Sequence, residues 1–262
     1  MTGGTKGIGL ATGLAFARRG AAVTLTSKWG SVEPEEVRAL FAAANAPEPV
    51  IADADAAHED DVRAVLEGIR QRHDRLEVLV SNVAFAPLVQ GFDDYARRGL
   101  AGAIDYSTWP IVSHTKIAKE VFGRYPHYVL GISSQGMDTY HGRYDIVAAA
   151  KAALEALCRY MHQRLRGEGT IVNLVKTRFV STDSLRAIAG DGFEAFADAH
   201  SPGLFTPPEE IAEAAVGLCS GLMDGVGGQT IVIDRGAAFF DTAARIDGAR
   251  IDERPTSPGK AE

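Results

Sequence analysis

The chain has 262 residues, of which 46% are hydrophobic and 23% charged, as is usual for soluble globular proteins. Its formal net charge is −7, from 27 basic and 34 acidic residues, which argues against binding nucleic acid or an anionic membrane through a basic surface. Two cysteines cannot form a disulfide framework, no Cys/His cluster has the spacing of a metal site, and no apolar run approaches the ~20 residues of a membrane span.

Short apolar runs alternate with helical patterns along the chain. The runs expected to be strands are residues 22–26, 50–52, 78–80, 128–132, 171–175 and 230–233. They are almost continuously apolar, as in parallel strands that are covered on both faces. The stretches expected to be helices are residues 9–19, 34–45, 59–72, 148–165 and 208–222. This alternation predicts an α/β fold with a doubly wound parallel sheet.

The domain organisation is expected to be simple. The sequence has no internal repeat or linker, so we expect one soluble, cytoplasmic domain over residues 1–242. Residues 243–262 are charged and contain Pro255 and Pro258, which predicts a disordered tail.

A glycine-rich loop opens the chain and leads into the first predicted helix. The candidate cofactor contacts in it are Gly3, Thr5, Lys6, Gly7, Ile8 and Gly9. Glycines let the backbone approach a pyrophosphate, and a helix N-terminus supplies N–H donors. A tight turn without a ligand is the alternative. Such a loop normally follows a central strand, for which Met1 leaves no room. We therefore expect that strand to be missing or truncated and the natural chain to begin upstream of Met1.

The strand predicted at residues 22–26 ends in Thr26-Ser27-Lys28 and carries no acidic residue there. An acid at this place would accept the ribose hydroxyls of NAD and repel a 2′-phosphate. With Lys6 as a second cation, charge complementarity favours NADPH, although NADH is possible. The alternative is that Lys28 is a solvated surface lysine.

The chain resembles the short-chain dehydrogenase/reductase family from residue 2 to about residue 240. The motifs that carry the resemblance are Thr2-Gly3-x3-Gly7-Ile8-Gly9, Asp55, Ser81-Asn82-Val83-Ala84, Ser134, Lys151, Asn173, Thr182 and the segment from Gly228 to Asp234. The resemblance implies a Rossmann-type fold that assembles as a homodimer or homotetramer.

The resemblance also implies roles for single residues. Asp55 would hydrogen-bond the adenine, and Asn82 and Ala84 would line the cofactor cleft. Thr182 would contact the nicotinamide carboxamide, and Lys151 would hold the nicotinamide ribose. A mobile substrate lid is implied around residues 183–205. Thr177-Arg178 stands where the family has Pro-Gly.

The spacing of the catalytic candidates departs from ordinary family members. These have a tyrosine four residues before the lysine, where this chain has Val147. Tyr144 lies seven residues before Lys151 instead, which is similar to the enoyl-acyl carrier protein reductase branch, and to its variant with a Thr-Gly-x3-Gly-Ile-Gly loop. Offsets of four and seven share one helix face, so both side chains can reach the cleft. Ser134 lies where ordinary members have a substrate-polarising serine.

This spacing favours reduction of an enoyl thioester on acyl carrier protein or coenzyme A. Hydride would go to the β-carbon, and the enolate oxygen that develops would need a donor, for which Tyr144 is placed. Two alternatives stay open. One is a carbonyl reductase that uses Ser134 with Tyr144 or Tyr140, and the other is a cofactor-binding module with little activity. His141 is a further candidate substrate contact.

Overall fold

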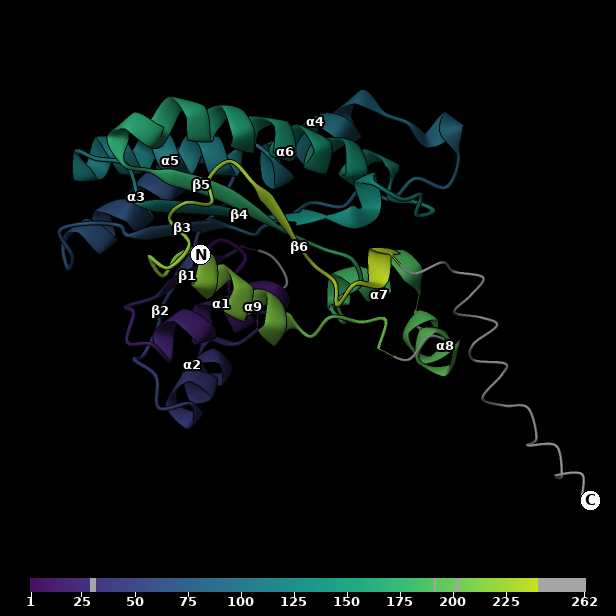
Figure 1. The fold of residues 1–262 in the computed structure, drawn as a ribbon, viewed down its shortest axis with the longest axis horizontal. Coiled ribbons are helices and arrows are strands. Elements are labelled where there is room, and N and C mark those ends of the chain that lie inside the picture. The colour runs from purple at the N-terminus through teal and green to yellow at the C-terminus, as the bar shows by residue number, and fades with distance from the viewer. Residues whose placement is uncertain (29–31, 191, 201–202, 240–262) are drawn as a thin grey trace, which may run out of the picture.

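The computed structural model describes residues 1–28, 32–190, 192–200 and 203–239 (Figure 1). The expected tail, residues 243–262, lies outside the described residues. The strands in the described residues are β1 Thr24–Ser27, β2 Val50–Asp53, β3 Val78–Ser81, β4 Tyr128–Ser134, β5 Ile171–Thr177 and β6 Thr230–Ile233. Each matches a predicted apolar run, and all the strand pairs are parallel. The predicted α/β class with a doubly wound sheet is confirmed.

The strands form two sheets, one of order β1-β2 and one of order β3-β4-β5-β6. The residues ahead of the glycine loop lie between β1 and β3. The Thr2 N–H donates to the Val80 carbonyl at 3.1 Å, and the Thr26 N–H donates to the Met1 carbonyl at 2.9 Å. Thr2 and Thr26 form a single parallel bridge. This short extended stretch therefore takes the central position of the sheet, although it is too short to be assigned as a strand.

Helices cover both faces of the sheet. The helices in the described residues are α1 Gly7–Ala17, α2 Pro34–Ala43, α3 Glu59–Arg70, α4 Arg97–Ser107, α5 Pro110–Phe122, α6 Asp145–Leu165, α7 Asp183–Ala189, α8 Phe193–His200 and α9 Pro208–Leu218. In Figure 1, α3, α5 and α6 lie on one face, and α1 and α9 pack together on the other. The predicted helices correspond to α1, α2, α3, α6 and α9, whereas the apolar pattern did not predict α4, α5, α7 and α8.

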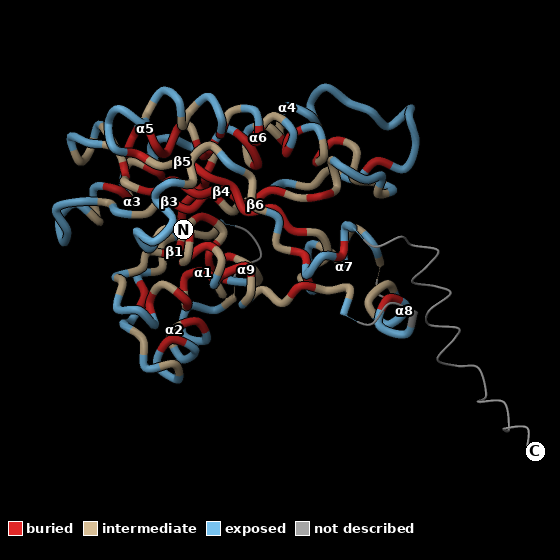
Figure 2. The backbone as a smooth tube through the Cα atoms, viewed as in Figure 1, coloured by how far each residue is buried: buried red, intermediate tan, exposed pale blue. Residues whose placement is uncertain are grey.

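The core lies between the sheet and these helices, as the buried inner strands in Figure 2 show. Alternate residues of β4 face opposite sides. Ile132 packs with Ile211 of α9, whereas Val129 packs with Leu154 of α6. Each such fully buried aliphatic side chain stabilises the fold by ~1.5–3 kcal/mol. The two core layers hold the carboxyl ends of β4 and β5 in place.

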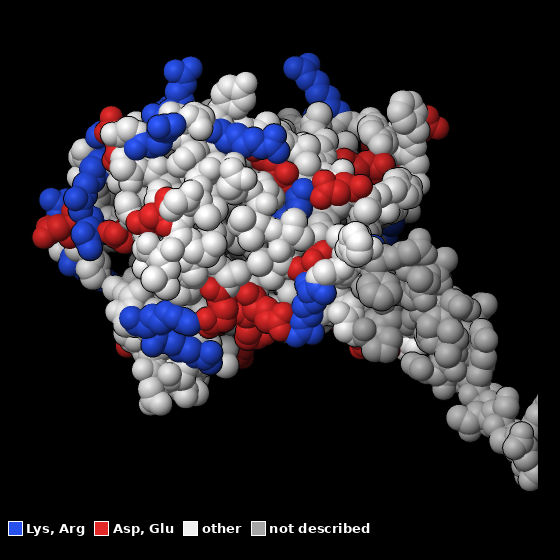
Figure 3. All heavy atoms as spheres, viewed as in Figure 1, with Lys and Arg blue, Asp and Glu red and all other residues white. Residues whose placement is uncertain are grey.

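The outer surface carries both signs of charge, which are interspersed on the face drawn in Figure 3. Exposed ion pairs also link neighbouring elements, and Arg19 after α1 pairs with Glu213 of α9. No helix in the described residues is long and apolar enough to cross a membrane.

Candidate active site

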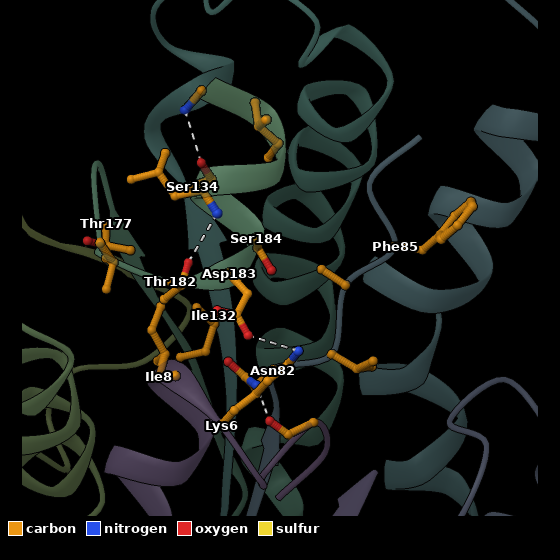
Figure 4. Close-up of a pocket in the computed structure, with 18 of the residues that line it drawn as sticks. Lys6, Ile8, Asn82, Phe85, Ile132, Ser134, Thr177, Thr182, Asp183 and Ser184 are labelled. Carbon is orange, nitrogen blue, oxygen red and sulfur yellow. Dashed lines mark hydrogen bonds and ion pairs between the residues drawn. The ribbon is translucent and has the colours of Figure 1, made fainter. Parts of the chain in front are cut away.

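A cavity of about 840 Å³ opens at the carboxyl ends of the strands. Its walls come from the glycine loop, the ends of β1, β4 and β5, the start of α6, and α7. Figure 4 shows Lys6 and Asn82 at one end, Ser134 at the other, and Thr182 between them. Segments far apart in sequence therefore meet in one cavity.

The glycine loop is shaped by close backbone approaches. Gly3 and Gly7 have φ of 57° and 54°, in the left-handed region that favours glycine. A Cβ on Gly9 would lie 2.1 Å from the Gly3 carbonyl oxygen, so the start of α1 packs directly on the loop. Gly3, Thr5, Lys6, Gly7 and Ile8 line the cavity, whereas Gly9 packs behind it. Lys6, the N-cap of α1, gives the helix no side-chain cap. The first N–H groups of α1 are therefore available to an anion.

Asn82, which follows β3, fixes the glycine loop. Its side-chain amide donates to the carbonyls of Thr2 and Gly3 at 3.1 and 2.9 Å. The Asn82 and Val83 N–H groups donate to the Thr2 hydroxyl. Asn82 and Ala84 both line the cavity. Together with the glycine cradle and the uncapped helix, this shape fits the pyrophosphate half of a dinucleotide.

The cavity end beside β1 and β2 is lined by Ser27, Lys28 and the residues that flank Asp55. Asp55 itself is 3% exposed, and it accepts from the Ala57 N–H at 2.9 Å and the Tyr106 hydroxyl at 3.1 Å. Its contact with adenine stays a prediction. Lys28 lines the cavity but pairs with Asp53 at 3.5 Å, a partner that the sequence did not suggest.

Ser134 and Tyr144 meet at the other end of the cavity. Ser134 ends β4 and caps the short turn η2 (Gln135–Met137), where its hydroxyl accepts from the Gly136 N–H at 3.2 Å. Tyr144 is the N-cap of α6, and its phenol is hydrogen-bonded to Ser134. A Cβ on Gly136 would lie 2.5 Å from the Tyr144 ring, so the ring rests on the turn. Burial raises the pKa of Tyr144, and the bond with Ser134 acts against that rise. Because the pKa lies above its usual value, the phenol stays a donor at neutral pH.

Lys151 lies on α6, two turns beyond Tyr144, and its side chain lines the same cavity. It is 5% exposed, and its ammonium donates to the Ile132 carbonyl at 2.6 Å. Burial lowers the pKa of Lys151 to about 8. Its charge is therefore poorly solvated and interacts strongly with any anion that enters the cavity.

The segment 183–205 follows Thr182, which caps α7 and accepts from the Leu185 N–H at 3.2 Å. Thr182 packs close to Gly7, and Asp183 forms an ion pair with Lys6 at 3.2 Å. This pair joins α7 to the glycine loop. Helix α7 therefore lies against the cavity. That residues 183–205 form a mobile lid stays a prediction.

Some cavity residues were not predicted from the sequence. Arg178 lines the wall, donates to the Ala237 carbonyl at 3.0 Å and stacks on Phe179. The Phe179 ring contacts His141, which lines the cavity as suggested, and burial and Arg178 lower the pKa of His141. Tyr140 is 87% exposed, so Tyr144 is the better placed of the two phenols. The one sequence sign of this wall was the departure at Thr177-Arg178.

Comparison with protein families gives one match over most of the chain. The model described as enoyl-(acyl carrier protein) reductase matches residues 3–238. The enoyl-[acyl-carrier-protein] reductase [NADH] of Aquifex aeolicus is 24% identical over 246 residues, which are 90% of this chain and 89% of that protein. The 1-cyclohexenylcarbonyl-CoA reductase of Streptomyces collinus is 26% identical over 265 residues, 98% of this chain and 92% of that protein.

Solved structures show the same fold. The structure of the enoyl-[acyl-carrier-protein] reductase (NADH) from Aquifex aeolicus superposes with a TM-score of 0.79 at 21% identity, covering 91% of this chain and 95% of that one. An NADH-dependent reductase complexed with NAD superposes with a TM-score of 0.72 at 20% identity, covering 90% and 94%.

Proposed function

This chain belongs to the enoyl-(acyl carrier protein) reductase family, and we propose that it reduces the 2,3 double bond of an enoyl thioester. The observation that carries the proposal is the meeting of Tyr144, Ser134 and the buried Lys151 in one cavity whose far end is the glycine cradle. A bound nicotinamide cofactor would supply the hydride. Gly3, Thr5, Lys6, Gly7, Ile8, Asn82, Ala84 and Thr182 are the residues proposed to hold it, with Gly9 shaping the loop and Asp55 on the adenine side.

The side chains of this site would stabilise the negative charge that develops on the thioester oxygen. Tyr144 donates a hydrogen bond to that oxygen, and Ser134, which is bonded to the phenol, fixes its direction. Lys151 stabilises negative charge on the phenol or the enolate, because its ammonium is buried beside the site. One such donor contributes about 3 kcal/mol in the transition state.

The test is oxidation of NADPH by a crotonyl thioester, followed at the absorbance of the reduced nicotinamide. Both the coenzyme A and the acyl carrier protein thioesters should be tried, since the relatives' names include both carriers. Tyr144→Phe should lower kcat about 100-fold or more while leaving cofactor binding intact. Tyr140→Phe is the matched control, because that phenol is exposed and off the site. A Tyr144→Phe variant as active as wild type would refute the role of Tyr144.

Carbonyl reduction is the second candidate, and the bond between Ser134 and Tyr144 favours it. A serine hydroxyl beside a phenol can polarise a ketone oxygen. If the protein reduces ketones and enoyl thioesters cause no oxidation of NADPH, carbonyl reduction is supported and enoyl reduction is rejected. If the protein binds the cofactor and turns over neither substrate, the remaining alternative is a cofactor-binding module with little activity.

We propose NADPH as the preferred cofactor, because Lys28 lines the cavity and no acid follows β1 at that position. The relatives compared above include NADH-dependent enzymes, and Asp53 compensates part of the Lys28 charge, so NADH is the competitor. Lys28→Ala should weaken NADPH binding about tenfold and leave NADH binding unchanged. Equal loss for both cofactors would contradict the assignment.

A homodimer or homotetramer is proposed from the family resemblance, with α6 at the contact. Tyr160 of α6 is 72% exposed, and Trp109 beside α5 is 45% exposed, which leaves apolar surface available on these helices. Light scattering after size exclusion gives the mass directly, and a monomer at micromolar concentration would refute the proposal.

A further inference from the structure

A buried lysine lies directly behind the cavity. Lys176 is near the end of β5 and pairs in register with Ser133 of β4, so both side chains point to the sheet face that α6 covers. The Lys176 side chain is 7% exposed. Its ammonium lies 2.9 Å from a carboxylate oxygen of Glu155 and 2.7 Å from one of Asp138. A buried ammonium is costly unless it is paired, so these contacts are needed.

The partners of Lys176 belong to the segments that carry the catalytic candidates. Glu155 is on α6, one turn beyond Lys151, and it also accepts from the Ser133 hydroxyl at 2.8 Å. Asp138 directly follows η2, the turn that begins after Ser134. Lys176 therefore connects β5, α6 and η2. We call Lys176, Glu155, Asp138 and Ser133 the Lys176 cluster.

The position of the η2 turn decides where the phenol lies. Gly136 of this turn leaves no space between the backbone and the Tyr144 ring, and the phenol is bonded to Ser134 at the start of the turn. The Asp138 N–H also donates to the Gln135 carbonyl at 2.9 Å, so Asp138 closes the turn. A shift of Asp138 would therefore move the support of Tyr144.

We propose that Lys176 is a positioning residue that holds the η2 turn, and with it Ser134 and Tyr144, in place relative to Lys151. It acts through Asp138 on the turn and through Glu155 on α6. The kinetic part of this inference rests on the proposed function, whereas the structural part concerns the turn alone. Misplacement by about 1 Å can cost two orders of magnitude in rate, so such a clamp matters for catalysis.

The charges within the Lys176 cluster support the proposal that Lys176 holds the η2 turn in place. Burial acts to lower the pKa of Lys176, but the hydrogen bonds and charges of Asp138 and Glu155 outweigh burial and raise the pKa above its usual value. Lys176 therefore stays charged, and both of its ion pairs persist at neutral pH. The Asp138 side chain is 50% exposed, so it can be changed without opening the core.

The test uses Asp138→Asn in the full chain. This variant keeps the buried pair of Lys176 and Glu155 and removes only the charged link to the turn. We expect kcat for crotonyl thioester reduction to fall about tenfold, with the NADPH dissociation constant unchanged. Hydrogen exchange of residues 134–139 should become faster, while exchange in β5 and α6 stays the same. The matched control is Glu213→Gln, an ion-paired acid that is 51% exposed and remote from the cavity.

A double variant separates positioning from mere charge balance. Lys176→Met leaves Glu155 buried without its cation and is expected to lower the melting temperature. Lys176→Met with Glu155→Gln removes both buried charges, so stability should recover while kcat stays low.

The outcomes separate the failure of this inference from that of the proposed function. Recovery of wild-type kcat in the double variant, or wild-type kcat and exchange in Asp138→Asn, would overturn the inference. If wild type fails to reduce enoyl thioesters, the proposed function fails, and faster exchange in Asp138→Asn still supports the clamp on the turn.

Discussion

The buried ammonium of Lys151 makes stability depend on pH in a direction that can be calculated. Burial lowers its pKa from 10.5 to about 8. One pKa unit corresponds to 1.36 kcal/mol, so the difference between folded and unfolded states amounts to about 3 kcal/mol. Between these pKa values the unfolded state binds more protons than the folded state, so the free energy of unfolding rises with pH. This contribution to the free energy of unfolding is fully present above the unfolded pKa, where Lys151 is neutral in both states. It is lost as the pH falls through the folded pKa of about 8.

Replacement of Lys151 by Met removes this titration and keeps the length of the side chain. Relative to Lys151→Met, wild type should gain about 3 kcal/mol of unfolding free energy between about pH 7 and pH 10.5. Urea titrations followed by circular dichroism at several pH values measure it. Lys116→Met is the matched control, because Lys116 is exposed on α5. Parallel stability curves for wild type and Lys151→Met would refute the reasoning, since they would mean that Lys151 is not desolvated.

Two glycines should tolerate no side chain. Gly136→Ala would place a Cβ 2.5 Å from the half-buried Tyr144 ring, so we expect kcat to fall about 100-fold with cofactor affinity unchanged. An unchanged kcat would mean that the ring does not rest on η2. Gly9→Ala would place a Cβ 2.1 Å from the Gly3 carbonyl oxygen, where backbone must move. We expect cofactor affinity to fall at least about tenfold and the melting temperature to drop, and calorimetric titration that gives wild-type affinity would contradict this.

The strands were predictable because parallel strands that are buried on both faces are almost continuously apolar. Two of the predicted runs are too short, however. The runs expected at residues 128–132 and 171–175 continue in the structure to Ser134 and Thr177. In the second of them, Lys176 is polar and yet buried. Nothing near Lys176 in sequence offers it a countercharge, and Glu155 and Asp138 become its partners only through the fold. A strand predicted from apolar residues alone therefore ends before Lys176, whereas β5 continues to Thr177.

The helix α5 was not predicted for a related reason. Its inward face carries buried polar residues at Ser113, His114 and Thr115, which interrupt the apolar period. Their polar atoms are satisfied by backbone carbonyls: Thr115 donates to Ile111 at 2.6 Å, and His114 bonds Ala56 at 3.0 Å. Hydropathy alone reads such a helix as exposed or irregular.

Candidate site residues were predictable where a motif fixes their place at a strand end, as for Ser134 and Asn82. Contacts between segments were not predictable from one sequence. The Lys28–Asp53 pair joins neighbouring strand ends, and the inward turn of Asp55 depends on Tyr106 of α4. The first contact bears on the proposed preference for NADPH and the second on the proposed adenine contact, and both require the packing of elements that the sequence does not place.

The single bridge between Thr2 and Thr26 links the short stretch at Thr2 to the β1-β2 sheet, which is separate from the four-stranded sheet. The cavity borders both sheets, because Ser27 lies at the end of β1 and Ser134 at the end of β4. A ligand that spans the cavity would contact both sheets. Its binding would increase the free energy of unfolding by RT ln(1 + [L]/Kd). Local opening of the β1-β2 sheet should then be the motion that saturating cofactor suppresses most.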